Sequence, residues 1–139
     1  MVKTTPKVSK TPVYFYAIGR RKSAVAAVKL FLAAGDSTIN KVAAKKYFSS
    51  LLNPTHYEGP FTATGVKTYH FSGRVMGGGL ESQSEALILA LSRAIKKSDD
   101  TQGEVLRNGG FLTVDSRVRQ RRNVGTGGKA RRAKQSPKR

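Results

Sequence analysis

The sequence predicts one compact domain that contains both strands and helices, followed by a long basic tail. Three observations support this prediction. The length of 139 residues is typical of one domain. Apolar residues alternate in some segments, as in strands, and recur at helical spacing in others. This patterning ends at about Val114, so we expect a disordered segment over residues 1–12, a globular domain over residues 13–115 and a tail over residues 116–139.

The first predicted element is a β-hairpin with a basic loop. Residues 13–18 are β-branched and aromatic, and residues 23–32 form a second apolar stretch. Between them lie Gly19, Arg20, Arg21 and Lys22. Both faces of the second stretch are fairly apolar when every other residue is counted, so we expect it to be a central strand.

A short helix and a further strand are expected next. The apolar spacing over residues 42–52 is that of one helix, which Pro54 would end. Over residues 66–75 the apolar side chains share one face, which indicates a half-exposed strand. Arg74 falls on the opposite face and should point outward.

The longest predicted helix follows three glycines, Gly77, Gly78 and Gly79. It covers residues 80–97, where apolar residues recur at helical spacing. Ser82 and Glu85 have the spacing of a capping box, which would start the helix proper at Gln83. A weaker helix is expected over residues 101–107.

The composition changes abruptly after Asp115. The chain carries 26 Lys and Arg against 8 Asp and Glu, a formal net charge of +18. Residues 116–139 hold ten of the basic residues and no acid, so the other 16 basic and 8 acidic residues leave +8 for residues 1–115. The tail has too few apolar side chains to fold alone, and we expect it to become ordered on a polyanion.

This charge makes nucleic acid the first candidate partner. A membrane is not expected, because the basic tail has almost no large apolar side chains to insert. We expect no metal and no cofactor, since the chain has no cysteine and only two histidines, His56 and His70. These histidines lack a matching nucleophile and a paired carboxylate, so we expect both to be surface or packing residues. No transmembrane run or signal peptide is evident, which favours a cytoplasmic location.

Three groups of residues are candidate RNA contacts. The cations of the hairpin loop lie beside two tyrosines, which suits phosphates and stacked bases, although a solvated turn is the alternative. The three glycines before the long helix expose N–H groups at its positive end, where a phosphate can bind, or they serve only the tight turn. Arg74 has no acidic neighbour in the sequence, which favours a phosphate contact.

The loop motif closely resembles the GRRK(T/S)AVA motif of the bacterial-type ribosomal protein S-nine family. It reads Gly19-Arg20-Arg21-Lys22-Ser23-Ala24-Val25-Ala26. The further matches, in order, are Gly77-Gly78-Gly79 with Gln83, Arg93-Ala94, Gly110-Phe111-Leu112-Thr113, and Ala130-Arg131-Arg132-Ala133. The chain departs from the family at Ala27, where the family usually has Arg, and at Ser82, which replaces a glycine.

The resemblance implies an α+β fold, with a small mixed sheet and packed helices of the ribosomal protein S-five domain-two-like type. It implies a non-enzymatic constituent of the small ribosomal subunit that binds ribosomal RNA in the head, beside neighbouring head proteins. The implied ribosomal RNA contacts are Arg20, Arg21, Lys22, Arg74, Gly77, Gly78, Gly79, Arg117, Arg119, Arg121, Arg122, Lys129, Arg131 and Arg132. The tail is expected to extend toward P-site tRNA, with contacts from Gln135, Lys138 and Arg139.

Two other classes of function are alternatives to this one. Small-metabolite kinases share this fold type, and Gly79-Leu80-Glu81-Ser82 faintly resembles their phosphate loop, but Glu81 would repel a nucleotide phosphate. The stronger alternative is a general nucleic-acid condensing protein, because charge alone does not distinguish DNA from RNA.

Overall fold

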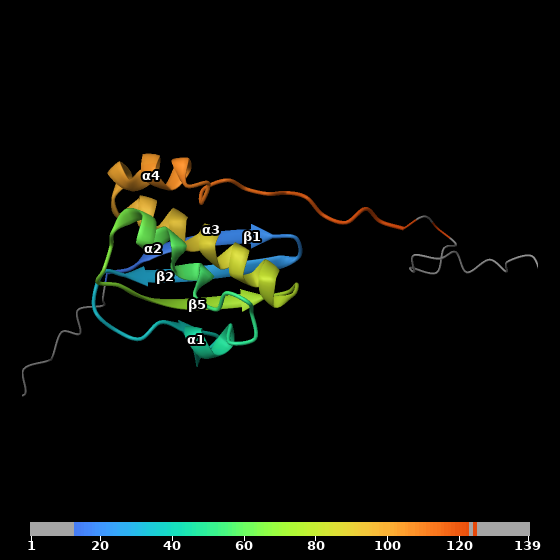
Figure 1. The fold of residues 1–139 in the computed structure, drawn as a ribbon, viewed down its shortest axis with the longest axis horizontal. Helices are drawn as coiled ribbons and strands as arrows, with labels where there is room; N and C mark the ends of the chain where they lie inside the picture. The colour runs from blue at the N-terminus through green and yellow to red at the C-terminus, as the bar shows by residue number, and fades with distance from the viewer. Residues whose placement is uncertain (1–12, 123, 125–139) are drawn as a thin grey trace, which may run out of the picture.

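The computed structural model describes residues 13–122 and Val124, and within them a five-stranded sheet carries a layer of helices (Figure 1). The strands are β1 (Phe15–Arg21), β2 (Ala24–Phe31), β3 (Thr38–Ile39), β4 (Val42–Ala43) and β5 (His70–Met76). The α-helices are α1 (Ala44–Tyr47), α2 (Gly59–Thr64), α3 (Leu80–Ser98) and α4 (Gly103–Asn108). Two 3-10 helices, His56–Glu58 and Asp100–Gln102, precede α2 and α4.

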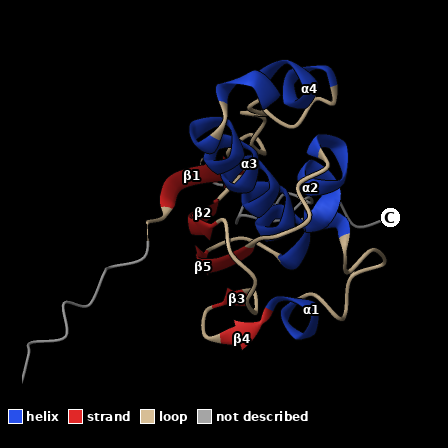
Figure 2. Ribbon diagram, turned by 90° about the vertical axis from the view of Figure 1, so that its left-hand side faces the viewer, coloured by secondary structure: helices blue, strands red, loops and turns tan. Residues whose placement is uncertain are grey.

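The sheet is mixed, with the strand order β1-β2-β5-β3-β4. β3 runs parallel to β5, and the other neighbouring strands are antiparallel. The helices lie on one side of the sheet, and no described element covers the other side (Figure 2). This confirms the predicted α+β class with a mixed sheet and packed helices, whereas the S-five domain-two-like type stays a prediction.

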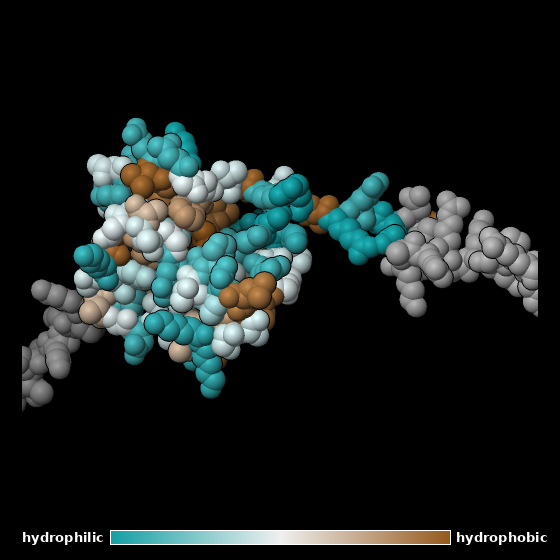
Figure 3. Space-filling view, in the orientation of Figure 1, coloured by the Kyte–Doolittle hydropathy of each residue, from teal (hydrophilic) through white to brown (hydrophobic). Residues whose placement is uncertain are grey.

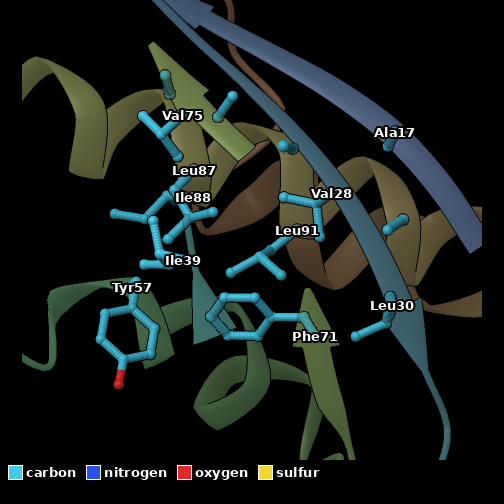
Figure 4. Packing of buried hydrophobic residues seen from close by; sticks show 14 of the residues in the cluster. Ala17, Val28, Leu30, Ile39, Tyr57, Phe71, Val75, Leu87, Ile88 and Leu91 are labelled. Carbon is cyan, nitrogen blue, oxygen red and sulfur yellow. The ribbon is translucent and has the colours of Figure 1, made fainter. Parts of the chain in front are cut away.

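The core lies between α3 and the three long strands. β2 is central, as predicted, because it pairs with both β1 and β5. Its residues Val28 and Leu30 are fully buried and, with Phe71 of β5, point toward Leu87 and Leu91 of α3 (Figure 4). The alternate buried side chains of the strands and the buried side chains of α3 therefore form one apolar layer.

The helix α3 confirms the longest predicted helix but not its predicted start. It begins at Leu80, and the extended residue Gly79 is the N-cap, without a side-chain hydrogen bond. Ser82 already lies inside the helix and is buried, so the predicted capping box with Glu85 is wrong. Gly77, Gly78 and Gly79 form the whole connection between β5 and α3, so the residue before the helix is a glycine, which has no side chain to cap it.

The single helix predicted over residues 42–52 is also wrong. Val42 and Ala43 pair with β3 as strand β4, and only one helical turn, α1, follows. Ala44 and Phe48 are buried, whereas Leu52 is 99% exposed. The apolar residues of this segment serve a short hairpin and one turn, and their spacing matched a longer helix by coincidence.

The basic motif does not form a loop, contrary to the prediction. β1 continues through Arg21, which pairs with Ala24, so only Lys22 and Ser23 make the turn. The predicted outward orientation of Arg74 is confirmed, since this residue is exposed on β5. The weaker predicted helix is present as the 3-10 turn and α4.

No described helix is long and apolar enough to cross a membrane. The described residues also contain no group of three or more His, Asp and Glu side chains that could hold a metal ion.

Candidate RNA-binding surface

The structure brings the hairpin turn and the glycine turn together at one end of the sheet. Gly77 and Gly78 have φ values of 73° and 65°, a left-handed conformation that favours glycine. A Cβ atom on Gly77 would collide with the carbonyl oxygen of Ser23, and one on Gly78 would lie 3.1 Å from the Cβ of Ala24. We call this region the basic end; it consists of Arg20, Lys22, the turn Gly77–Gly79 and the start of the tail at Arg117.

Hydrogen bonds hold the glycine turn at the start of α3. The Gln83 Nε2 donates to the carbonyl oxygen of Gly77 at 2.9 Å, and the Tyr47 hydroxyl donates to the Gln83 Oε1 at 2.8 Å. No side chain caps the first turn of this helix of 19 residues. Its free N–H groups and the positive end of its dipole therefore face the same region as the hairpin turn.

Lys22 occupies the tip of the hairpin in a conformation that lysine rarely adopts. Its φ of 52° lies in the left-handed region, which costs a residue with a Cβ roughly 1–2 kcal/mol. Strained residues of this kind concentrate at functional sites. Lys22 and Arg20 are both exposed, so both can reach a phosphate.

Arg21 differs from its two basic neighbours because it already has protein partners. Its side chain is 14% exposed, with Nε 2.6 Å from Oε2 of Glu85 and Nη2 3.1 Å from Oδ2 of Asp115. Its Nη1 also donates to the carbonyl oxygen of Arg117 at 3.3 Å. Arg21 thus ties β1 to α3 and to the start of the tail.

The start of the tail is held on the domain by Asp115. The Asp115 Oδ1 accepts a hydrogen bond from the backbone N–H of Arg117 at 2.9 Å, and Oδ2 lies 2.6 Å from the Arg117 Nη2. These bonds, together with the charges of Arg117 and Arg21, hold the pKa of Asp115 well below its usual range. The same contacts raise the pKa of Arg117.

This arrangement predicts a specific pH dependence. Because the pKa of Asp115 is lower in the folded chain than the unfolded value of about 3.9, its carboxylate stabilises the fold above that pH, and the contribution is lost as the pH falls. Asp115→Asn should therefore make the free energy of unfolding fall less steeply between about pH 5 and pH 2. Urea unfolding at stepped pH measures this, with Asp36→Asn as the control outside the network. Equal slopes for wild type and Asp115→Asn would contradict the role of Asp115.

The rest of the described tail has no regular secondary structure and runs away from the domain (Figure 1). It forms a largely hydrophilic projection (Figure 3). Arg119 and Arg121 are exposed, and Arg122 is half-buried. The remaining predicted contacts lie outside the described residues; they are Lys129, Arg131, Arg132, Gln135, Lys138 and Arg139.

Arg74 lies apart from the helix start, on the face of the sheet that no described helix covers. It lines an open hollow together with Lys29 and Lys41, two cations that the sequence analysis did not single out. The outward position of Lys29 follows from strand alternation and could have been inferred, whereas that of Lys41 depends on the β3–β4 turn. Arg93 and Lys97 have structural roles that the sequence did not indicate. The Arg93 Nη1 donates to the carbonyl oxygen of Ile18 at 2.6 Å, and the Lys97 Nζ donates to that of Tyr16 at 2.7 Å, both on the edge strand β1.

Comparison with known proteins gives a consistent result. The family profile described as Ribosomal protein S9/S16 matches residues 19–139. The chain is 38% identical to the small ribosomal subunit protein uS9 of Rickettsia bellii, over 99% of this chain and 84% of that protein. It is 40% identical to uS9 of Leifsonia xyli, over 88% of this chain and 74% of that protein. The uS9 of Rickettsia rickettsii is 37% identical, over 96% and 89%. The chain therefore belongs to the ribosomal protein S9/S16 family, and it is a structural, non-enzymatic component of the ribosome.

Proposed function

We propose that the chain binds ribosomal RNA in the head of the small subunit, beside neighbouring head proteins, through the basic end and the tail. The main support for this proposal is that the hairpin turn and the glycine turn, which are distant in the sequence, pack directly against each other. Cations and free helix N–H groups, the two kinds of group that bind phosphates, are thereby joined in one region. Family membership supports this function over general nucleic-acid condensation.

At the basic end the contacts are made with the RNA backbone. Arg20 offers a planar guanidinium that can hold two phosphate oxygens, and Lys22 offers a compact ammonium at the tip. Backbone N–H groups of the glycine turn and of the first turn of α3 can donate to a phosphate, and the charges of Arg20 and Lys22 offset the repulsion from Glu81 in that turn. These contacts position the domain on the RNA and read no base sequence.

The tail extends this interaction away from the domain. Its ten basic residues and lack of acid favour ordering along phosphates, and its 24 residues could span up to roughly 80 Å when extended. We place its last residues, including Gln135, Lys138 and Arg139, at P-site tRNA. Charge and reach support this proposal, since both cations can meet a second phosphate backbone without reading its bases.

The basic end can be tested by separating its exposed cations from Arg21. Arg20→Ala with Lys22→Ala should flatten the dependence of log affinity on log salt by about 1.4 to 1.8, because two phosphate contacts are lost. Arg21→Ala should leave this slope nearly unchanged and lower the free energy of unfolding instead, because Arg21 joins Glu85 and Asp115. Filter binding to small-subunit ribosomal RNA between about 50 and 200 mM salt measures the slope.

The control is Arg107→Ala with Lys67→Ala, which removes two exposed cations that are not part of the basic end. If the double variant at positions 20 and 22 has the same slope as this control, the basic end does not bind the RNA. Co-sedimentation of the chain with small subunits at high salt separates the ribosomal function from general condensation.

A further inference from the structure

We propose that the uncovered face of the sheet binds a stretch of unpaired RNA, with phosphates against Lys29, Lys41 and Arg74 and one base against Tyr16. This inference rests on the proposed function and adds to it a second group of RNA contacts, formed by residues that are not part of the basic end. It follows from the strand register, the shape of the face, the turn that carries Lys41, and the distribution of charge.

The register places the relevant side chains in two adjacent rows across the sheet. In one row, Tyr16 of β1 is paired with Lys29 of β2, and Lys29 with Ser72 of β5. In the next row, Ala27 of β2 is paired with Arg74 of β5. These positions alternate with the buried ones that face α3, so all of them lie on the side without helices (Figure 2).

The face is hollowed at these rows. Small residues form the floor, and the cations and Tyr16 surround it, which leaves an open hollow of about 740 Å³. The lining residues are Tyr16, Ala27, Lys29, Asn40, Lys41, Ser72, Gly73 and Arg74. Tyr16 is 43% exposed and lines the hollow, so its ring is available to a base.

The turn between β3 and β4 places Lys41 at the hollow. Asn40 and Lys41 both have positive φ values, 49° and 69°. The Asn40 side chain donates to the carbonyl oxygen of Val75 at 2.9 Å and accepts from its N–H at 3.0 Å, which anchors the turn to β5. Positive φ values at both central residues are those of a type I′ turn, so the two-residue hairpin between β3 and β4 fixes the backbone of Lys41 beside the hollow.

The charge of the residues that line the hollow favours an anionic ligand. None of the five strands contains an Asp or Glu, and seven of the eight acids of the chain lie after β4, in or next to the helices and in the Asp115 network. The hollow is therefore lined by three cations and no acid. Such a surface attracts phosphates and repels acidic protein segments.

The combination of cations with an exposed tyrosine favours unpaired RNA over a duplex. Bases can stack on an aromatic ring only when they are unpaired, and proteins that bind single strands combine such rings with a basic groove along the backbone. Lys29 is also positioned by a ring, since its Nζ lies 4.9 Å from the centroid of Tyr14. A paired helix would place its phosphates on the cations and leave Tyr16 without a base.

The test uses the full chain and a fluorescein-labelled 15-nucleotide oligouridine, with a hairpin duplex as the second probe. The combination of Lys29→Gln, Lys41→Gly and Arg74→Gln should flatten the salt dependence of oligouridine binding by about 2, at about 0.7 for each phosphate contact. Glycine is used at position 41 because it accepts the φ of 69°. Tyr16→Leu should weaken oligouridine binding about tenfold and leave duplex binding unchanged.

The matched control combines Lys45→Gln, Lys67→Gln and Arg107→Gln, three exposed cations that do not line the hollow. Equal slopes for the two triple variants would overturn the inference, as would equal effects of Tyr16→Leu on both probes. In assembled small subunits, ultraviolet crosslinks from Tyr16 should reach RNA, and crosslinks to a protein would overturn the inference.

The variants at positions 20 and 22 separate the two hypotheses. If they flatten the slope for ribosomal RNA and the sheet variants change nothing, the proposed function stands and the sheet face is not an RNA-binding surface. If neither set has an effect, both the inference and the proposed function fail.

Discussion

Gly19→Ala is expected to lower the free energy of unfolding by about 3 kcal/mol, a large effect for the addition of one methyl group. A Cβ atom at this position would collide with the carbonyl oxygen of Ala86 and lie 2.6 Å from the backbone nitrogen of Ala90. Both atoms belong to the backbone of α3, so no side chain can rotate away to relieve the contact. Strand and helix must separate, and the packing of the core between them is lost.

Urea unfolding of the full chain measures this effect, and Gly79→Ala is the matched control. Gly79 has no atom within 4 Å of an added Cβ and a φ of −95°, so alanine fits there. As an N-cap, it should lose at most about 1 kcal/mol. If Gly19→Ala costs no more than this control, β1 and α3 do not approach as closely as described.

Removal of the tail after Val118 is expected to have the largest effect on RNA binding. The removed segment contains nine basic residues, namely Arg119, Arg121, Arg122, Lys129, Arg131, Arg132, Lys134, Lys138 and Arg139. If all nine contact phosphates, the salt dependence of binding to small-subunit ribosomal RNA should flatten by up to roughly 6 to 8. The chain ending at Val118 keeps Arg117, so the Asp115 network remains and the free energy of unfolding should be unchanged.

A shorter truncation tests the end of the tail separately. The chain ending at Pro137 lacks only Lys138 and Arg139, and it should assemble into small subunits normally. Retention of P-site tRNA by these subunits should weaken by about 1 kcal/mol, the scale of a few charge-assisted contacts. Filter retention of tRNA over a range of salt measures this. If the truncated and intact subunits hold tRNA equally, the tail end anchors only ribosomal RNA.

Periodicity determined the elements that face the core. The sequence predicted three features: the burial of alternate residues in β2, the outward position of Arg74 and the buried stripe of α3. These follow because a strand or helix with one apolar face is stable only when that face is buried in the core. Among the described residues no helix or strand follows Asn108, and the domain boundary at residue 115 stays a prediction.

Local patterns were less reliable where two structures share one spacing. The residues around Val42 and Phe48 satisfy helical spacing but belong to a strand and a single turn. Ser82 and Glu85 have capping-box spacing, yet Gly79 starts the helix. In the first case pairing with β3, which is itself paired with the distant strand β5, outweighed the helical preference. In the second case the turn that joins β5 to α3 decided where the helix begins.

Composition and motif by themselves determined that this protein is a basic, non-enzymatic member of a ribosomal family, with its charge concentrated in a tail. Only the tertiary structure decided which cations are free. Arg20, Arg21 and Lys22 are equivalent in sequence, but Arg21 alone meets Glu85, 64 positions away, and the carbonyl oxygen of Arg117, 96 positions away. Lys29, Lys41 and Arg74 are scattered along the chain and become one surface through the order of the strands. The physical reason is that periodicity records which side of an element is buried, whereas ion pairs and shared surfaces depend on which distant elements pack together.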